Sequence, residues 1–130
     1  MSSSRRNLWP QDIAVTDLVP PVAILKEQAS LLGKQTQNLV EAHVVLGGSR
    51  NPGMYPFHYY FQVIAPALDG YRYNLFSISH GVQFYPVRIE FEDADIEVQN
   101  EEEFMTALAN IFSSDKTKGI ISALIAQSKA

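Results

Sequence analysis

Residues 55–91, YPFHYYFQVIAPALDGYRYNLFSISHGVQFYPVRIEF, decide the fold of this chain. They contain all six tyrosines and five of the seven phenylalanines. Short runs of aromatic and β-branched residues are separated by Pro66, by a turn ending at Gly70, and by His80-Gly81. Such runs between proline and glycine predict strands joined by turns. We therefore expect an antiparallel sheet over this stretch.

The same pattern of runs and breaks gives the limits of each strand. Strands are expected at residues 39–46, 57–65, 71–79 and 83–91, with a candidate fifth at 95–98. Pro86 falls inside the fourth of these. Because proline has no N–H for the ladder, that strand is expected at a sheet edge or with a bulge.

Helices are predicted on both sides of the strands in the sequence. Pro21 suits the first turn of a helix over residues 21–34. Asn100, followed by three glutamates, is typical of a capped helix start, and Ser114 or Asp115 opens a last helix. The order α-β-β-β-β-(β)-α-α predicts an α+β fold, a mainly antiparallel sheet of four to five strands with the helices on one face.

The chain has the length of one domain, residues 1–130, with an irregular N-terminal arm over residues 1–20. Apolar side chains in the arm are expected to pack against the body: Leu8, Trp9, Ile13 and Val15. A 46% hydrophobic and 18% charged composition is that of a folded globule. No secretory signal and no membrane-length apolar segment are present, so we expect a cytoplasmic protein.

Composition also excludes several kinds of site. The chain has no cysteine, which excludes disulfides, thiolate metal sites and a cysteine nucleophile. Its net charge is −4, and eight of its fourteen acids fall within residues 90–103. No basic stripe exists, which argues against nucleic-acid binding. The acidic run is interpreted as a solvated strand end and helix start, or as a docking face for a basic partner.

Alternation along the strands predicts two different sheet faces. One face is apolar and should receive the helices; it includes Phe57, Tyr59, Phe61, Val63, Ala65, Tyr71, Tyr73 and Leu75. The other is mixed. Its polar and aromatic members are Glu41, His43, His58, Tyr60, Gln62, Arg72, Asn74, Arg88 and Glu90, and its apolar members are Ile64, Phe76, Ile78 and Phe84.

Two readings of the mixed face stay open. It is what a one-sided antiparallel sheet presents to water, with cross-strand ion pairs. It is also a platform that could hold an anion between Arg72 and Arg88 and transfer a proton through a histidine. Its apolar members indicate that part of it is covered, by the arm, the last helix or another chain.

Motifs that would name a reaction are missing. The sequence has no Gly-x-Ser-x-Gly, and Ser79 and His80 point to opposite faces of a strand. It also lacks His-Glu-x-x-His and the dinucleotide-binding glycine pattern, and Gly47-Gly48-Ser49 lacks the Lys-Ser/Thr of a phosphate loop. We therefore predict no metal and no cofactor.

Two functional hypotheses follow. The first is a non-enzymatic protein that binds a protein partner or itself, as a homodimer, through the mixed face. This hypothesis involves no nucleic acid and no membrane, and it predicts that Tyr60→Ala and Phe76→Ala weaken association. The alternative is a small enzyme or ligand-binding protein with an anion pocket, in which His58 is the acid/base and Arg72 or Arg88 contacts the anion.

Overall fold

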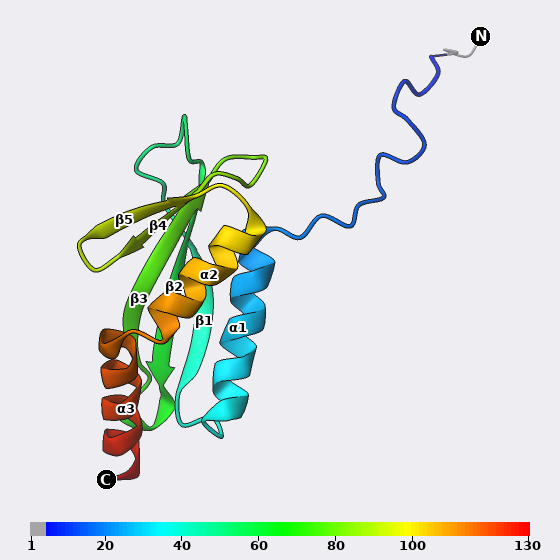
Figure 1. Cartoon of the computed structure of the whole chain (residues 1–130). Coiled ribbons are helices and arrows are strands. Elements are labelled where there is room, and N and C mark those ends of the chain that lie inside the picture. The colour runs from blue at the N-terminus through cyan, green and yellow to red at the C-terminus, as the bar shows by residue number, and fades with distance from the viewer. Residues whose placement is uncertain (1–4) are drawn as a thin grey trace.

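Three helices lie on one face of a five-stranded antiparallel sheet (Figure 1). The computed structural model describes residues 5–130. Its elements are α1 (Pro21–Gln35), β1 (Glu41–Gly47), β2 (Phe57–Ala65), a short 3-10 turn (Pro66–Leu68), β3 (Tyr71–His80), β4 (Val87–Phe91), β5 (Ala94–Val98), α2 (Glu101–Phe112) and α3 (Asp115–Lys129). The strands pair in sequence order, so the sheet is a simple meander. The α+β prediction is confirmed.

The predicted helix starts are confirmed by their capping contacts. Pro21 is the first residue of α1, a position at which a backbone N–H would have no hydrogen-bond partner within the helix. The Asn100 side chain accepts a hydrogen bond from the backbone N–H of Glu103, and Ser114 does the same for Thr117. These bonds satisfy N–H groups that a helix leaves unpaired in its first turn.

The fourth strand is shorter than the prediction and starts after Pro86. β4 begins at Val87 and lies between β3 and β5, so both of its edges are paired. A proline inside such a strand would leave a gap in the ladder. The chain instead turns before it, with Phe84 at a φ of 75°. The predicted bulge or edge position for Pro86 is therefore wrong.

A β-bulge at Leu75 changes which side chains of β3 face the helices. Phe61 pairs with Phe76, but the next residue of β2, Gln62, pairs with Asn74, so Leu75 is the extra residue. Alternation along β3 therefore shifts by one position. Phe76 and Ile78 lie in the core under the helices, and their prediction on the mixed face is wrong.

The helices and the helix-covered face of the sheet share one hydrophobic core. It runs from Ile24 in α1 to Leu124 in α3, and Phe61 and Phe104 are its largest fully buried side chains. Each large buried side chain contributes about 1.5–3 kcal/mol relative to its exposed state. None of the three helices described for residues 5–130 has the length and apolar content needed to cross a membrane.

The N-terminal arm does not pack against the body. Its described part leaves the start of α1 and extends away (Figure 1). The side chains predicted to be covered are largely exposed: Leu8 82%, Trp9 71%, Ile13 62% and Val15 79%. The arm joins the body at Pro20, which is extended (φ −72°, ψ 153°) and precedes a second proline. This pair holds the chain straight as it leaves α1, because a residue before proline is excluded from helical angles.

Candidate functional site

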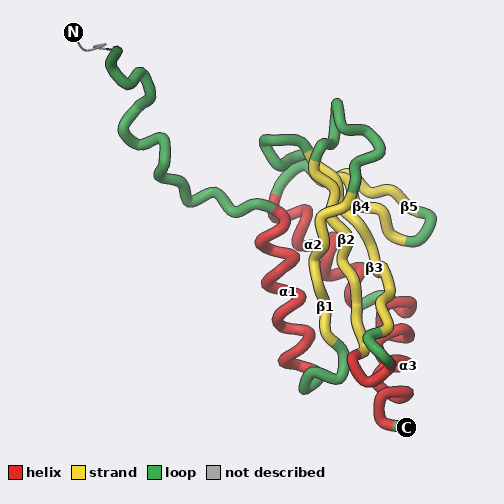
Figure 2. Tube along the Cα trace, turned by 180° about the vertical axis from the view of Figure 1, so that it is seen from behind, coloured by secondary structure: helices red, strands yellow, loops and turns green. Residues whose placement is uncertain are grey.

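The mixed face of the sheet carries no helix. Seen from behind, β1, β2 and β3 lie in front of the helices (Figure 2). We call this the uncovered face. The strand pairing places the predicted polar site residues on it in cross-strand rows, and only Phe76 among the predicted site residues lies elsewhere.

The rows are fixed by the pairing of each strand with the next. Directly paired residues share a face of the sheet. From one end of the uncovered face to the other, the rows are Glu41-Ile64-Arg72, His43-Gln62-Asn74, Val45-Tyr60-Ser77-Glu90-Asp95 and Gly47-His58-Ser79-Arg88-Glu97.

An exposed amide network joins the first two rows. Gln62 Nε2 donates a hydrogen bond to Asn74 Oδ1 at 2.8 Å, and Arg72 donates to Gln62 Oε1 at 3.3 Å. Arg72 and Asn74 are exposed, and Gln62 is half-buried. The network orients the Arg72 guanidinium along the sheet and leaves its remaining N–H groups free for an acceptor.

His58 is the most enclosed titratable side chain of the uncovered face. It is buried, its Nδ1 shares a hydrogen bond of 2.7 Å with Ser79 Oγ, and its ring meets the Tyr60 ring edge-on, with centroids 4.8 Å apart. Burial lowers the pKa of His58 from 6.5, the negative charge of Glu90 partly opposes this, and Arg50 lowers the pKa further. The imidazole is therefore neutral at pH 7.

Sequence reasoning missed the partner of His58. It compared Ser79 only with the adjacent His80, whereas the hydrogen bond joins residues on neighbouring strands. The turn between β2 and β3 would by itself place Ile78 opposite His58, and the bulge at Leu75 shifts the pairing by one residue and brings Ser79 there instead. This buried pair holds the two strands together at the end of the face near the β1–β2 loop.

Tyr60 covers the glycine at the end of β1. A Cβ at Gly47 would overlap the Tyr60 ring, so this position requires a residue without a side chain. The ring therefore lies flat along the sheet rather than pointing out from it. On its other side Tyr60 lines a small hollow of about 250 Å³ together with Asn74, Ser77 and Glu90.

The charge of Arg88 is already matched. Its guanidinium forms an ion pair with Asp95, and this hydrogen bond raises the pKa of Arg88 above its ordinary range. Glu90 and Glu97 lie on the same face nearby. Because both partners are partly exposed, the pair contributes little to stability.

Arg72 lies too far from His58 to share an anion pocket with it, and Arg88, in the same row as His58, is ion-paired with Asp95. Arg72 lies in the first row and His58 and Arg88 in the last, seven residues apart along β3. At about 3.3 Å per residue, that separation is roughly 23 Å. Direct proton transfer and anion capture need contacts of about 3 Å. Within residues 5–130, no three His, Asp or Glu side chains are grouped closely enough to hold a metal ion.

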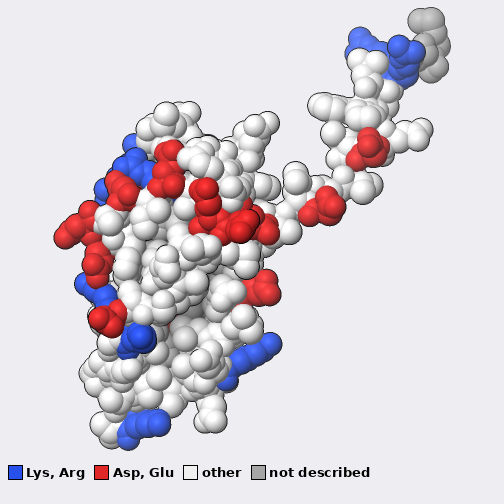
Figure 3. All heavy atoms as spheres, viewed as in Figure 1, with Lys and Arg blue, Asp and Glu red and all other residues white. Residues whose placement is uncertain are grey.

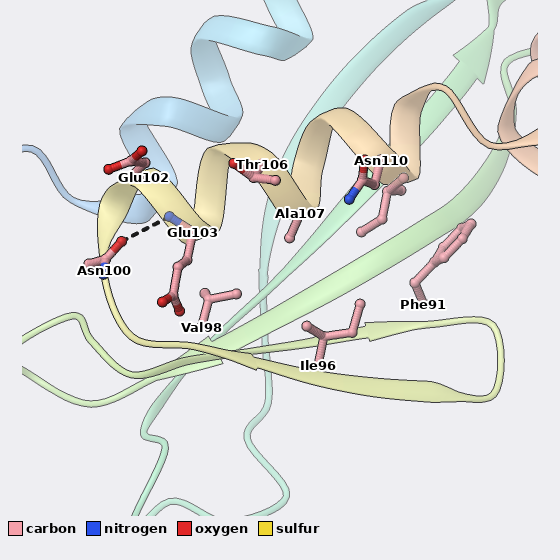
Figure 4. A pocket seen from close by; sticks show the side chains of 10 residues that line it. Phe91, Ile96, Val98, Asn100, Glu102, Glu103, Thr106, Ala107 and Asn110 are labelled. Carbon is pink, nitrogen blue, oxygen red and sulfur yellow. Dashed lines mark hydrogen bonds between the residues drawn. The ribbon is translucent and has the colours of Figure 1, made fainter.

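The two larger hollows lie away from the uncovered face. One, of about 570 Å³, lies between α1 and α3 over the core and is lined mainly by apolar side chains, with Lys118 at its border. The other, of about 670 Å³, lies between α2 and the β4–β5 hairpin (Figure 4). We call it the α2 hollow. None of the predicted site residues lines either one.

Acidic side chains gather on the end of the body from which the arm leaves (Figure 3). Basic side chains lie at the far tip of the arm and toward the opposite end of the body, and others lie among the acids along one side of the body. The acids belong to the β4–β5 hairpin and the start of α2, where residues 90–103 contain no Lys or Arg. Most side chains of this acidic segment are exposed, which agrees with its interpretation as a solvated strand end and helix start.

The free edges of the sheet differ in how well they are protected. β5 is short and carries Asp95 and Glu97, and the half of β3 that extends past β4 contains the bulge. Charges, short strands and bulges are the usual means of preventing edge-to-edge association. β1 has none of them beyond Glu41 at its start, although α1 packs along it on the helix-covered face (Figure 1). Its Val45 and Leu46 are 38% and 65% exposed.

Comparison of the chain with protein-family models, with curated proteins and with solved structures finds no match.

Proposed function

We propose that this protein is a non-enzymatic self-associating module that forms a homodimer through antiparallel pairing of β1 with β1 of a second copy. The observation that carries the proposal is the open edge of β1. An edge strand presents a row of unpaired N–H and C=O groups, and a second strand is the partner that satisfies them. Exposed Val45 and Leu46 on that edge add apolar area for a partner to cover.

The sequence of β1 suits pairing with itself. Full overlap of Glu41–Gly47 with its copy centres the two-fold axis on Val44, which then meets Val44 of the second copy. Residues opposite each other in this register share a face, so the helices of both copies lie on the same side. Glu41 falls opposite Gly47 rather than opposite a second Glu41, so no like charges meet.

The dimer joins the two uncovered faces into one continuous surface. The rows containing Glu41, His43 and Val45 lie next to the two-fold axis and would continue across it. A single strand pair buries less area than a standard stable interface. We therefore expect a weak dimer whose population depends on concentration.

Light scattering after size exclusion, over a range of chain concentrations, tests the proposal. The mass should rise from the 14.5 kDa of one chain toward twice that value. Leu46→Lys places a charge on the exposed edge without touching the core, and it should remove the association that depends on β1, lowering the mass measured at each concentration. Met105→Lys is the matched control, because Met105 is also an exposed apolar residue but lies on α2.

Two results would contradict the proposal. One is a wild-type chain that stays monomeric at every concentration reached. The other is Leu46→Lys associating as strongly as the wild type. Circular dichroism of both variants shows whether the fold is retained, so a loss of association through unfolding is recognised separately.

A further inference from the structure

We propose that the N-terminal arm of one copy docks into the α2 hollow of a second copy. The arm is the most apolar exposed segment in the described part of the chain. Its exposed large apolar side chains are Leu8, Trp9, Ile13, Val15, Leu18 and Val19. Its hydrogen bonds are local, joining residues two or three apart. Apolar side chains gathered along one exposed segment are typical of an interaction site.

The α2 hollow offers an apolar surface of the right kind. Figure 4 shows Val98, Ile96 and Phe91 on the hairpin side facing Ala107 on α2, with Ile111 completing the apolar lining. Glu102, Glu103, Thr106 and Asn110 form its polar border. A volume of about 670 Å³ lies in the range of sites that enclose a ligand larger than one side chain.

Charge selects this hollow over the one between α1 and α3. Arg5 and Arg6 precede Leu8 and Trp9 with only Asn7 between them, so the tip of the arm places a positive charge beside two of its exposed apolar residues, whereas Asp12 and Asp17 lie nearer the body. The α2 hollow has an acidic border and lies within the acidic segment of residues 90–103 and α2. The other hollow has Lys118 at its border. Opposite charges steer the tip of the arm toward the first and away from the second.

The direction of the arm favours a second copy over its own body. Pro20 and Pro21 hold the first residues of the arm extended, and the arm points away from the body in both views (Figures 1 and 2). Residues 5–19 span at most about 50 Å at roughly 3.3 Å per residue, which is enough to reach a neighbouring molecule. This docking uses a different surface from β1 pairing, so either can occur without the other.

Trp9 is the only tryptophan, so its fluorescence reports docking directly. Two full-length chains are mixed. One keeps Trp9 and carries Ile96→Lys, which blocks its own hollow. The other carries Trp9→Ser and keeps the hollow intact. We expect a blue shift and protection from acrylamide quenching in the mixture, and neither change in the Ile96→Lys chain alone.

Matched variants test where the arm docks and whether its positive charge contributes to docking. Thr106→Arg, at an exposed site on the border, should block docking as Ile96→Lys does, even if Ile96→Lys is poorly folded. Leu31→Lys in the other hollow should have no effect. Glu102→Lys should weaken docking by about twofold to fivefold, the range of an exposed ion pair, and adding Arg6→Glu should restore it.

The proposal is overturned if the mixture shows no shift, or if the Ile96→Lys chain alone shows the same shift as the wild type. It is also overturned if Leu31→Lys removes the shift, since the arm would then occupy the other hollow. Leu46→Lys is expected to leave docking intact, so a failure of β1 pairing and a failure of arm docking are distinguishable.

Discussion

Phe76→Ala should destabilise the fold rather than weaken association. Phe76 is 4% exposed. Its ring stacks on Phe61 with centroids 5.0 Å apart and planes 12° apart, and it also meets Phe112 at 5.9 Å. Phe61 and Phe112 are 5.5 Å apart, so the three rings form a closed cluster. Removing the Phe76 ring leaves a cavity between the sheet and the last turn of α2.

The size of the effect follows from burial. A buried Phe→Ala substitution costs about 3–5 kcal/mol of unfolding free energy. With a typical urea dependence of about 2 kcal/mol/M, the midpoint should fall by about 2 M. Phe57→Ala is the matched control: the same substitution on β2, but at a ring that is 37% exposed. It should cost about 1 kcal/mol, close to the ordinary effect of a point mutation.

Urea denaturation followed by circular dichroism at a fixed chain concentration measures both variants. Trp9 fluorescence is unsuitable here, because Trp9 lies in the exposed arm and does not report on the core. A loss below about 1 kcal/mol for Phe76→Ala, together with weaker association, would refute the reasoning, since such a loss is ordinary for an exposed site. Such a result would mean that the Phe76 ring lies on the uncovered face and that β3 has no bulge at Leu75.

Three further predictions concern the cap of α2, the protonation of His58 and the space beside Gly47. Asn100→Ala should cost about 1 kcal/mol in the same urea assay, because the first turn of α2 loses its cap. The pKa of His58 is lowered by burial, so the unfolded chain takes up the proton first; stability should fall as pH drops below about 6.5, and His58→Gln should flatten that part of the pH profile. Gly47→Ala should displace the Tyr60 ring, seen as a change in its NMR shifts, whereas Gly48→Ala, with nothing within 4 Å of the added Cβ, should leave the ring in place.

The features that the sequence predicted well are those with local chemical causes. Pro21 and Asn100 mark helix starts because each fits a backbone position that has an unpaired N–H. The limits of β2 follow from the aromatic run and from Pro66, which cannot continue the ladder. Because consecutive strands are connected directly, the predicted site residues, except Phe76, come together in rows on the uncovered face.

The features that the sequence did not predict depend on contacts between residues far apart in the chain. Nothing in residues 5–20 shows whether the arm packs on the body, because that depends on a surface elsewhere in the chain. The bulge did leave a signal. Polar residues in β3 occupy even positions at Arg72 and Asn74 but odd positions at Ser77 and Ser79, and an adjacent apolar pair marks the change. Counting one unbroken alternation through that pair placed Phe76 on the wrong face.

This shift of phase also changes where a partner is expected. With an unbroken alternation, Phe76 and Ile78 would project from the uncovered face and would need another chain to cover them. With the bulge, Ser77 and Ser79 take those places, and these small side chains let His58 and Tyr60 lie close to the sheet. The uncovered face then has less need of cover for stability, because most of its polar side chains are hydrogen-bonded, ion-paired or exposed to water and its one large aliphatic side chain from β2, Ile64, is already buried. Exposed apolar side chains remain at the β1 edge and along the arm, and these are the two surfaces at which we expect association.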